Sequence, residues 1–142
     1  MILKLPYRKY PAPHAPGGFF YAASLPVHIS NVGDRPLSSK RFDAIIDSGA
    51  TSCLFHASIG RAIGLDIEKG RMAETLGVAG PSREYLHMIT LHIPGGPITT
   101  LAGFSYDLPI AGLLGIAGFF EHFRVTFDPT ELCCELERLH RV

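Results

Sequence analysis

An acidic residue ends an apolar segment in the first half of the chain. Asp47 directly follows Ala44-Ile45-Ile46 and precedes Ser48 and Gly49. A carboxylate in this position can act as a general acid or base, and the neighbouring glycine lets the backbone approach it closely. Asp, Ser and Gly are also common turn residues, so the triplet alone predicts a turn more readily than a catalytic site.

The cysteines and histidines give a weaker hypothesis. Cys53 and His56 have the C-x-x-H spacing of a zinc-ligand pair, but no second pair with suitable spacing accompanies them. Cys133 and Cys134 are direct neighbours and cannot form a C-x-x-C motif. We therefore expect reduced cysteines, no disulfide framework, and neither a bound metal nor a cofactor.

Several glycine-containing segments match known motifs only in part. Half of the Gly-x-Ser-x-Gly motif of serine hydrolases occurs at 80–82 and at 103–105. Residues 77–80 have the GxxG spacing of an RNA-binding loop, without the basic residues and the two helices that such a loop needs. The glycines near 112–118 stand in a β-prone context, which does not favour a dinucleotide-binding loop.

The overall composition limits the classes of function. The chain has 142 residues, with 13 Lys and Arg against 13 Asp and Glu, so its net charge is 0 when His is neutral. This length suits one domain with a hydrophobic core. Zero net charge and scattered basic residues argue against nucleic-acid binding. No apolar run suits a membrane span and the start lacks the features of a signal peptide, so we expect no membrane association and a cytoplasmic location.

Fifteen glycines and eleven prolines divide the chain into short segments, which predicts an all-β sandwich or barrel with minor helices. Residues 1–18 are rich in proline and predict an extended arm, followed by a domain at 19–142. Apolar spacing predicts a helix at 55–63 and a shorter one at 118–123. Residues 71–93 predict a long hairpin with a glycine-containing tip. Further strands are expected at 19–30, 41–47, 98–102, 104–109, 124–127 and 131–139.

The order of these segments resembles that of the retropepsin-like, or retroviral-type, aspartic peptidases. The apolar strand that leads into Asp47-Ser48-Gly49-Ala50-Thr51 is similar to the active-site loop of this family, and a helix is expected after it. The hairpin at 71–93 lies where the family carries its flap. The resemblance extends over about residues 19–139.

The end of the chain carries the third part of the resemblance. Leu113-Leu114-Gly115 is similar to the two hydrophobic residues and glycine of the family, and the helix and strand expected after it agree in order. Many relatives place a polar residue directly after this glycine. Here Ile116-Ala117-Gly118 follows instead, so the polar anchor of those relatives is absent.

The resemblance implies a single closed, barrel-like β domain with a flap hairpin and two short helices. It implies an aspartic endopeptidase, in which one carboxylate takes a proton from water and one carboxylic acid polarises the peptide carbonyl. The chain has a single Asp-Ser-Gly triplet, at Asp47. The two acids must therefore come from two copies, and a symmetric homodimer supplies them.

The same resemblance assigns supporting roles to two further groups. The residues expected to support the active-site loop are Ser48, Gly49, Ala50 and Thr51. The residues expected to close over an extended peptide substrate are Gly77, Val78, Ala79 and Gly80. A plain hairpin turn at 77–80 is an open alternative. A non-catalytic dimerisation or peptide-binding module on the same fold is the alternative for the whole chain, because fold does not determine activity.

Overall fold

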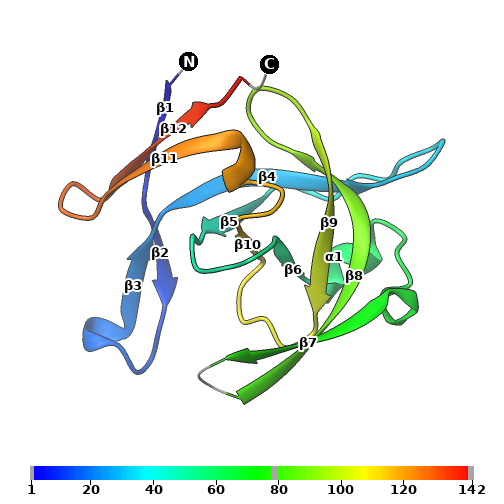
Figure 1. Cartoon of the computed structure of the whole chain (residues 1–142). Helices are drawn as coiled ribbons and strands as arrows, with labels where there is room; N and C mark the ends of the chain where they lie inside the picture. The colour runs from blue at the N-terminus through cyan, green and yellow to red at the C-terminus, as the bar shows by residue number, and fades with distance from the viewer. Residues whose placement is uncertain (1, 78–79, 141–142) are drawn as a thin grey trace.

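Most of the chain forms β-strands (Figure 1). The computed structural model describes residues 2–77 and 80–140. The strands are β1 (Ile2–Pro6), β2 (Arg8–Pro11), β3 (Phe19–Ala22), β4 (Ser24–Asn31), β5 (Phe42–Ile46), β6 (Leu54–His56), β7 (Arg71–Gly77), β8 (Gly80–His92), β9 (Ile98–Ser105), β10 (Gly112–Leu114), β11 (Phe123–Asp128) and β12 (Cys133–Arg138). The helical segments are α1 (Ala57–Ala62) and the 3₁₀ turns η1 (Pro16–Gly18), η2 (Ile67–Lys69) and η3 (Phe120–His122). The all-β prediction is confirmed.

The largest sheet closes on itself. Its strands follow the order β4-β5-β10-β6-β9-β8-β7, and β4 also pairs with β8, so β7 alone stands outside the closure. The hairpin of β7 and β8 is the one expected at 71–93, and it extends away from the rest of the ring (Figure 1). The closed, barrel-like arrangement expected from the sequence is consistent with this ring of strands.

The hydrophobic core fills the inside of the ring, because alternate residues of each strand point inward. Ala44 and Ile46 of β5 are almost fully buried, and so is Leu114 of the neighbouring β10. The rings of Phe55 on β6 and Phe104 on β9 are fully buried and lie 5.9 Å apart, centroid to centroid. These residues fix the strands that precede and follow Asp47. Within the described residues, no helix is long and apolar enough to cross a membrane.

The two ends of the chain form a separate three-stranded sheet in the order β1-β12-β11. The Pro-rich arm expected at 1–18 is extended, but it is also paired. Its first strand pairs with β12 and its second with β3. Leu3 and Leu5 of β1 pack against the core, which explains why this segment does not stand apart.

Both helices expected from apolar spacing are shorter than predicted. Phe55 belongs to β6, where its ring packs edge-on against Phe42, and α1 begins only at Ala57. The second helix, expected at 118–123, is reduced to the single 3₁₀ turn η3. Gly118 has a φ of +92°, which interrupts a right-handed helix, and β11 takes over at Phe123.

Two stacked histidines lie where β4 and β8 close the ring. His28 and His92 face each other across this pairing, with ring centroids 4.3 Å apart. The Nε2 atom of His92 is also hydrogen-bonded to the Ser30 hydroxyl at 2.9 Å. Burial, and then the neighbouring His28, hold the pKa of His92 below its usual value of 6.5. Protonation of His92 is therefore less favourable in the folded chain than in the unfolded chain.

We expect the folded state to lose stability as the pH falls below about 6.5, because the unfolded chain then takes up a proton that folded His92 resists. This contribution is intact above pH 6.5 and disappears as the pH falls through the lower pKa of the folded state. His92→Gln is expected to reduce this dependence, measured by urea unfolding between pH 5 and 8. The exposed His14 provides the matched control, His14→Gln. An unchanged pH dependence in His92→Gln would contradict the assignment.

Candidate active site

Asp47 is held at the point where two parallel strands end side by side. Strand β5 runs parallel to β10, with Ile46 opposite Leu114. The Asp47 amide continues this ladder by donating to the Leu114 carbonyl at 3.0 Å. The carboxylate therefore stands directly after the last buried residue of β5, on a backbone fixed by its neighbour.

The loop after Asp47 turns tightly and directs one backbone amide at the carboxylate. The Gly49 amide donates to Asp47 Oδ1 at 2.8 Å, and the Ala50 amide donates to the Asp47 carbonyl at 3.1 Å. A Cβ atom added to Gly49 would lie 3.2 Å from Asp47 Oδ1. The glycine thus allows the close approach expected from the sequence, and the carboxylate is oriented by the backbone of its own loop.

A second segment crosses behind this loop. The amides of Ile116 and Ala117 donate to the carbonyls of Ala50 and Thr51, at 2.9 and 3.0 Å. A Cβ atom on Gly115 would collide with the backbone of Ala50 and Ser52, so the crossing requires a glycine there. The polar side chain that many relatives carry after this glycine is missing, and these two backbone hydrogen bonds connect the segments instead.

The tip of the loop that follows Asp47 is open to solvent. Asp47 and Ala50 are partly buried, whereas Ser48, Gly49 and Thr51 are exposed. Within 2–77 and 80–140, the hydroxyls of Ser48 and Thr51 make no hydrogen bond. These hydroxyls are available to a partner that contacts the loop.

The hairpin expected as a flap is present, although its tip is described only in part. Gly77 ends β7 and Gly80 begins β8, and these two residues form the last pair of the ladder. Val78 and Ala79 lie outside the described residues. The role in substrate binding that was expected for these four tip residues therefore stays a prediction.

One face of the ring sheet is open, and it is the face on which Asp47 lies. Ala44 and Ile46 point into the core, so Asp43, Ile45 and Asp47 alternate onto the opposite side. Ile45 stands beside Leu113 of β10, and Leu113 stands beside Leu54 of β6. All three are only partly buried.

This apolar row next to Asp47 was not singled out from the sequence. Its sequence signal was limited to the segment 41–47, which alternates at its start and becomes fully apolar at Ala44-Ile45-Ile46. The register across the sheet was needed to join Ile45, Leu113 and Leu54 into one row.

An apolar cavity of about 460 Å³ adjoins this row at Ile45. Its walls include Tyr10 and Phe20 from the β2–β3 hairpin, Ile45 from β5 and Ile110 from the loop before β10. Tyr10 and Phe20 stack at 5.5 Å, and the Tyr10 hydroxyl is hydrogen-bonded to Ser24 at 2.7 Å. The cavity is large enough for an apolar amino-acid side chain.

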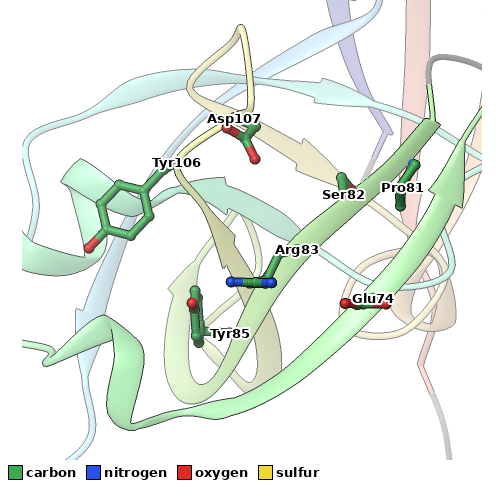
Figure 2. Close-up of a pocket in the computed structure, with 7 residues that line it drawn as sticks. All are labelled: Glu74, Pro81, Ser82, Arg83, Tyr85, Tyr106 and Asp107. Atoms are coloured by element: carbon green, nitrogen blue, oxygen red, sulfur yellow. The ribbon is translucent and has the colours of Figure 1, made fainter.

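A second cavity, of about 430 Å³, lies between the β7–β8 hairpin and the loop after β9 (Figure 2). Glu74, Arg83 and Tyr85 line it from the hairpin, and Tyr106 and Asp107 line it from the loop. Glu74 is paired with Arg83 in the ladder, so both side chains belong to the same face of the hairpin. Tyr106 in turn donates a hydrogen bond of 2.5 Å to Glu68, which attaches the loop to η2.

Cys53 and His56 have different hydrogen-bond partners. Cys53 is fully buried and donates to the Ala117 carbonyl at 3.6 Å, and burial raises the pKa of its thiol to about 11. His56 caps α1, because its Nδ1 accepts a hydrogen bond from the Ser58 amide at 3.1 Å. Among the residues described, no group of three or more His, Cys, Asp or Glu side chains could hold a metal ion.

Comparison with known proteins gives matches among solved structures. No protein-family model matches the chain, and no curated protein matches it. The structure of a retropepsin-like aspartic protease from Rickettsia conorii matches with a TM-score of 0.59 and 16% sequence identity, over 96% of this chain and 91% of that one. The EIAV protease in complex with the inhibitor HBY-793 gives a TM-score of 0.47 and 22% identity, over 66% of this chain and 80% of its own.

The Rickettsia match extends over nearly the whole chain. At 16% identity it is a likeness of fold, and the position of Asp47 at the end of β5 is an observation made independently in this chain. The chain has the fold of the retropepsin-like aspartic proteases.

Proposed function

We propose that this protein is an aspartic endopeptidase that works as a symmetric homodimer, with Asp47 of each copy in one shared active site. The observation that carries the proposal is the placement of Asp47. It follows a buried strand, its Oδ1 accepts the Gly49 amide at 2.8 Å, and it lies on the open face of the ring. The Gly49 hydrogen bond alone is that of an ordinary Asx turn, so the support comes from the place of the carboxylate, directly after β5 in a fold that is similar to that of aspartic proteases.

Peptide hydrolysis by carboxyl groups needs both an acid and a base. Two carboxyls close together share one proton over a range of pH, because both cannot ionise cheaply at short distance. One member of the pair then takes a proton from water while the other donates to the peptide carbonyl. Since the chain has a single Asp-Ser-Gly triplet, a two-fold axis beside Asp47 would supply the second acid.

Two surfaces support association of this kind. The active-site loop presents the exposed Ser48 and Thr51, whose hydroxyls could bond across the axis. The terminal sheet has open edges at β1 and β11, where Ile2 and Phe127 are 64% and 40% exposed. Open strand edges pair readily with another chain.

The proposed substrate is an extended peptide. It would lie along the open face, with a side chain in the cavity beside Ile45 and with the β7–β8 hairpin above it. Backbone hydrogen bonds to strand edges hold peptides in this manner, and pockets for alternate side chains then give specificity.

The test is cleavage of a mixed peptide library at a series of protein concentrations. We expect internal peptide bonds to be cut, and we expect the rate per chain to fall about tenfold for each tenfold dilution below the dissociation constant of the dimer. Sedimentation at the same concentrations measures the fraction of dimer. Absence of cleavage at concentrations where the chain is dimeric would refute the proposal, and a constant rate per chain would refute the shared site.

A further inference from the structure

Glu84, in the first half of β8, is a buried acid that the proposed reaction does not use. It is 9% exposed, and it is the one charged residue in the buried set of the described part of the chain. Carboxylates are rarely buried unless they are paired, because removing the charge from water is costly. Its position therefore requires an explanation.

Glu84 lies on the open face that also carries Asp47. Leu86 stands opposite Gly103 of β9, and Gly103 stands opposite Leu54 of β6, so these positions share one face. Glu84 is two residues from Leu86 on the same strand and faces the same way. Leu54 stands beside Leu113 of β10, and Leu113 stands beside Ile45 of β5. Ile45 is two residues before Asp47.

The missing side chain of Gly103 makes room for the Glu84 carboxyl group. A Cβ atom on this glycine would lie 3.0 Å from both Cδ and Oε1 of Glu84, and 3.0 Å from a methyl carbon of Leu54. The carboxyl group thus lies over β9 and close to Leu54. It marks the end of the apolar row that starts at Ile45.

The Glu84 carboxyl group is in contact with solvent, because no fully buried side-chain oxygen in the described part of the chain lacks a hydrogen-bond partner. It takes part in no hydrogen bond and in neither of the ion pairs found there. Arg71 of β7, which stands opposite Leu86 of β8, is exposed and forms no ion pair with Glu84. Burial raises the pKa of Glu84, and no neighbouring cation counteracts this effect. Arg83 alternates onto the other face, toward the cavity in Figure 2.

We propose, building on the peptidase function above, that Glu84 selects substrates with a lysine or arginine side chain close to the scissile bond. Strands β5 and β6 are separated by β10 alone, a distance of about 10 Å, which an extended peptide covers in about three residues. The methylene stem of Lys or Arg would lie on Leu54 and Leu113, and its cationic end would reach the carboxylate. A cation satisfies both the charge and the hydrogen-bonding capacity of Glu84.

The test compares two peptides that differ at one position, lysine in one and norleucine in the other, with the position scanned on both sides of the cleaved bond. At one position we expect the wild-type protein to have a higher kcat/KM for the lysine peptide. Glu84→Gln is expected to lower kcat/KM for that peptide roughly 10- to 100-fold, since a hydrogen bond to a charged group is lost. The norleucine peptide should be cut by both proteins at about the same rate.

Glu74→Gln is the matched control. It makes the same chemical change in the same hairpin, on the face that carries Arg83, and it should keep the preference for lysine. Binding of the two peptides to Asp47→Asn chains, with and without Glu84→Gln, gives a readout that needs no cleavage. Here too the lysine peptide should bind more tightly only when Glu84 is present.

The possible outcomes separate this inference from the function on which it rests. Cleavage without any preference for lysine or arginine, or a preference that survives Glu84→Gln, overturns the role of Glu84 and leaves the peptidase intact. If the lysine peptide is bound selectively but the wild-type protein cuts no peptide, the role of Glu84 is supported and the peptidase function is overturned. Equal binding of both peptides to the Asp47→Asn chain overturns the role of Glu84 by itself.

Discussion

Replacing Asp47 with asparagine is expected to lower the rate of peptide cleavage by about 10²- to 10⁴-fold, the usual contribution of general acid–base catalysis. Asparagine has nearly the same shape, and its amide oxygen can still accept the Gly49 N–H that now lies 2.8 Å from Asp47 Oδ1. It cannot take a proton from water. The loop should therefore keep its structure while the reaction stops, and peptide binding should persist. The measurement is cleavage of a fluorogenic peptide at constant dimer concentration.

Asp34→Asn serves as the control for this change, because Asp34 is exposed in the turn after β4 and does not belong to an Asp-Ser-Gly triplet. Mixing wild-type and Asp47→Asn chains adds a second readout. With equal amounts and free exchange, about a quarter of the dimers carry two aspartates, so the activity should fall faster than the wild-type content. Full activity of Asp47→Asn would exclude Asp47 from catalysis. Peptide binding by a wild-type chain that never cleaves would indicate a binding module on this fold.

The segments predicted correctly from the sequence are those in which local pattern and tertiary position agree. The β7–β8 hairpin and the β5 strand before Asp47 belong to this class. Both segments have alternating or apolar residues, which predict a strand. The glycines that follow them predict where each strand ends. The turn after β5 could be predicted because Asp47, the small residues after it and the strand before it lie within a few residues of one another, whereas the catalytic role of Asp47 stays a prediction.

The helix expected at 55–63 shows where a local pattern misleads. Phe55 and Ile59 have helical spacing, yet Phe55 is placed by long-range pairing opposite Gly112 of β10. A buried strand residue directly before a short helix reproduces the spacing of a longer helix. Local periodicity does not distinguish these two cases, since the partner strand lies far away in the sequence.

The role proposed for Glu84 depends on contacts between strands that cannot be predicted from the sequence. Its face is set by the register of β8 on β9, and its space is set by Gly103 and Leu54. In the sequence, Glu84 stands in a polar stretch beside Ser82 and Arg83 and suggests a solvent-exposed strand. Only the closed ring of strands shows that it is buried on the same face as Asp47.

Replacing Gly115 with alanine is expected to lower the free energy of unfolding by about 3 kcal/mol or more, the upper range for overpacking a tight site. The added methyl group would meet backbone atoms of Ala50 and Ser52. Backbone atoms cannot rotate away as the end of a flexible side chain can, so one of the two segments must move. The measurement is urea unfolding at fixed protein concentration, because a dimer gains apparent stability from association.

Ile116→Ala is the matched control. The Ile116 side chain is 45% exposed, and the hydrogen bond from its backbone amide to the Ala50 carbonyl does not depend on the side chain. It should change the unfolding free energy by no more than about 0.5 kcal/mol. If Gly115→Ala folds at all, the segment behind the loop must shift, and the hydrogen bonds from Ile116 and Ala117 to the loop weaken with it. Because these bonds hold the loop that carries Asp47, cleavage should fall even in molecules that remain folded. A Gly115→Ala protein with unchanged stability would mean that the two segments do not cross as closely as their backbone hydrogen bonds indicate.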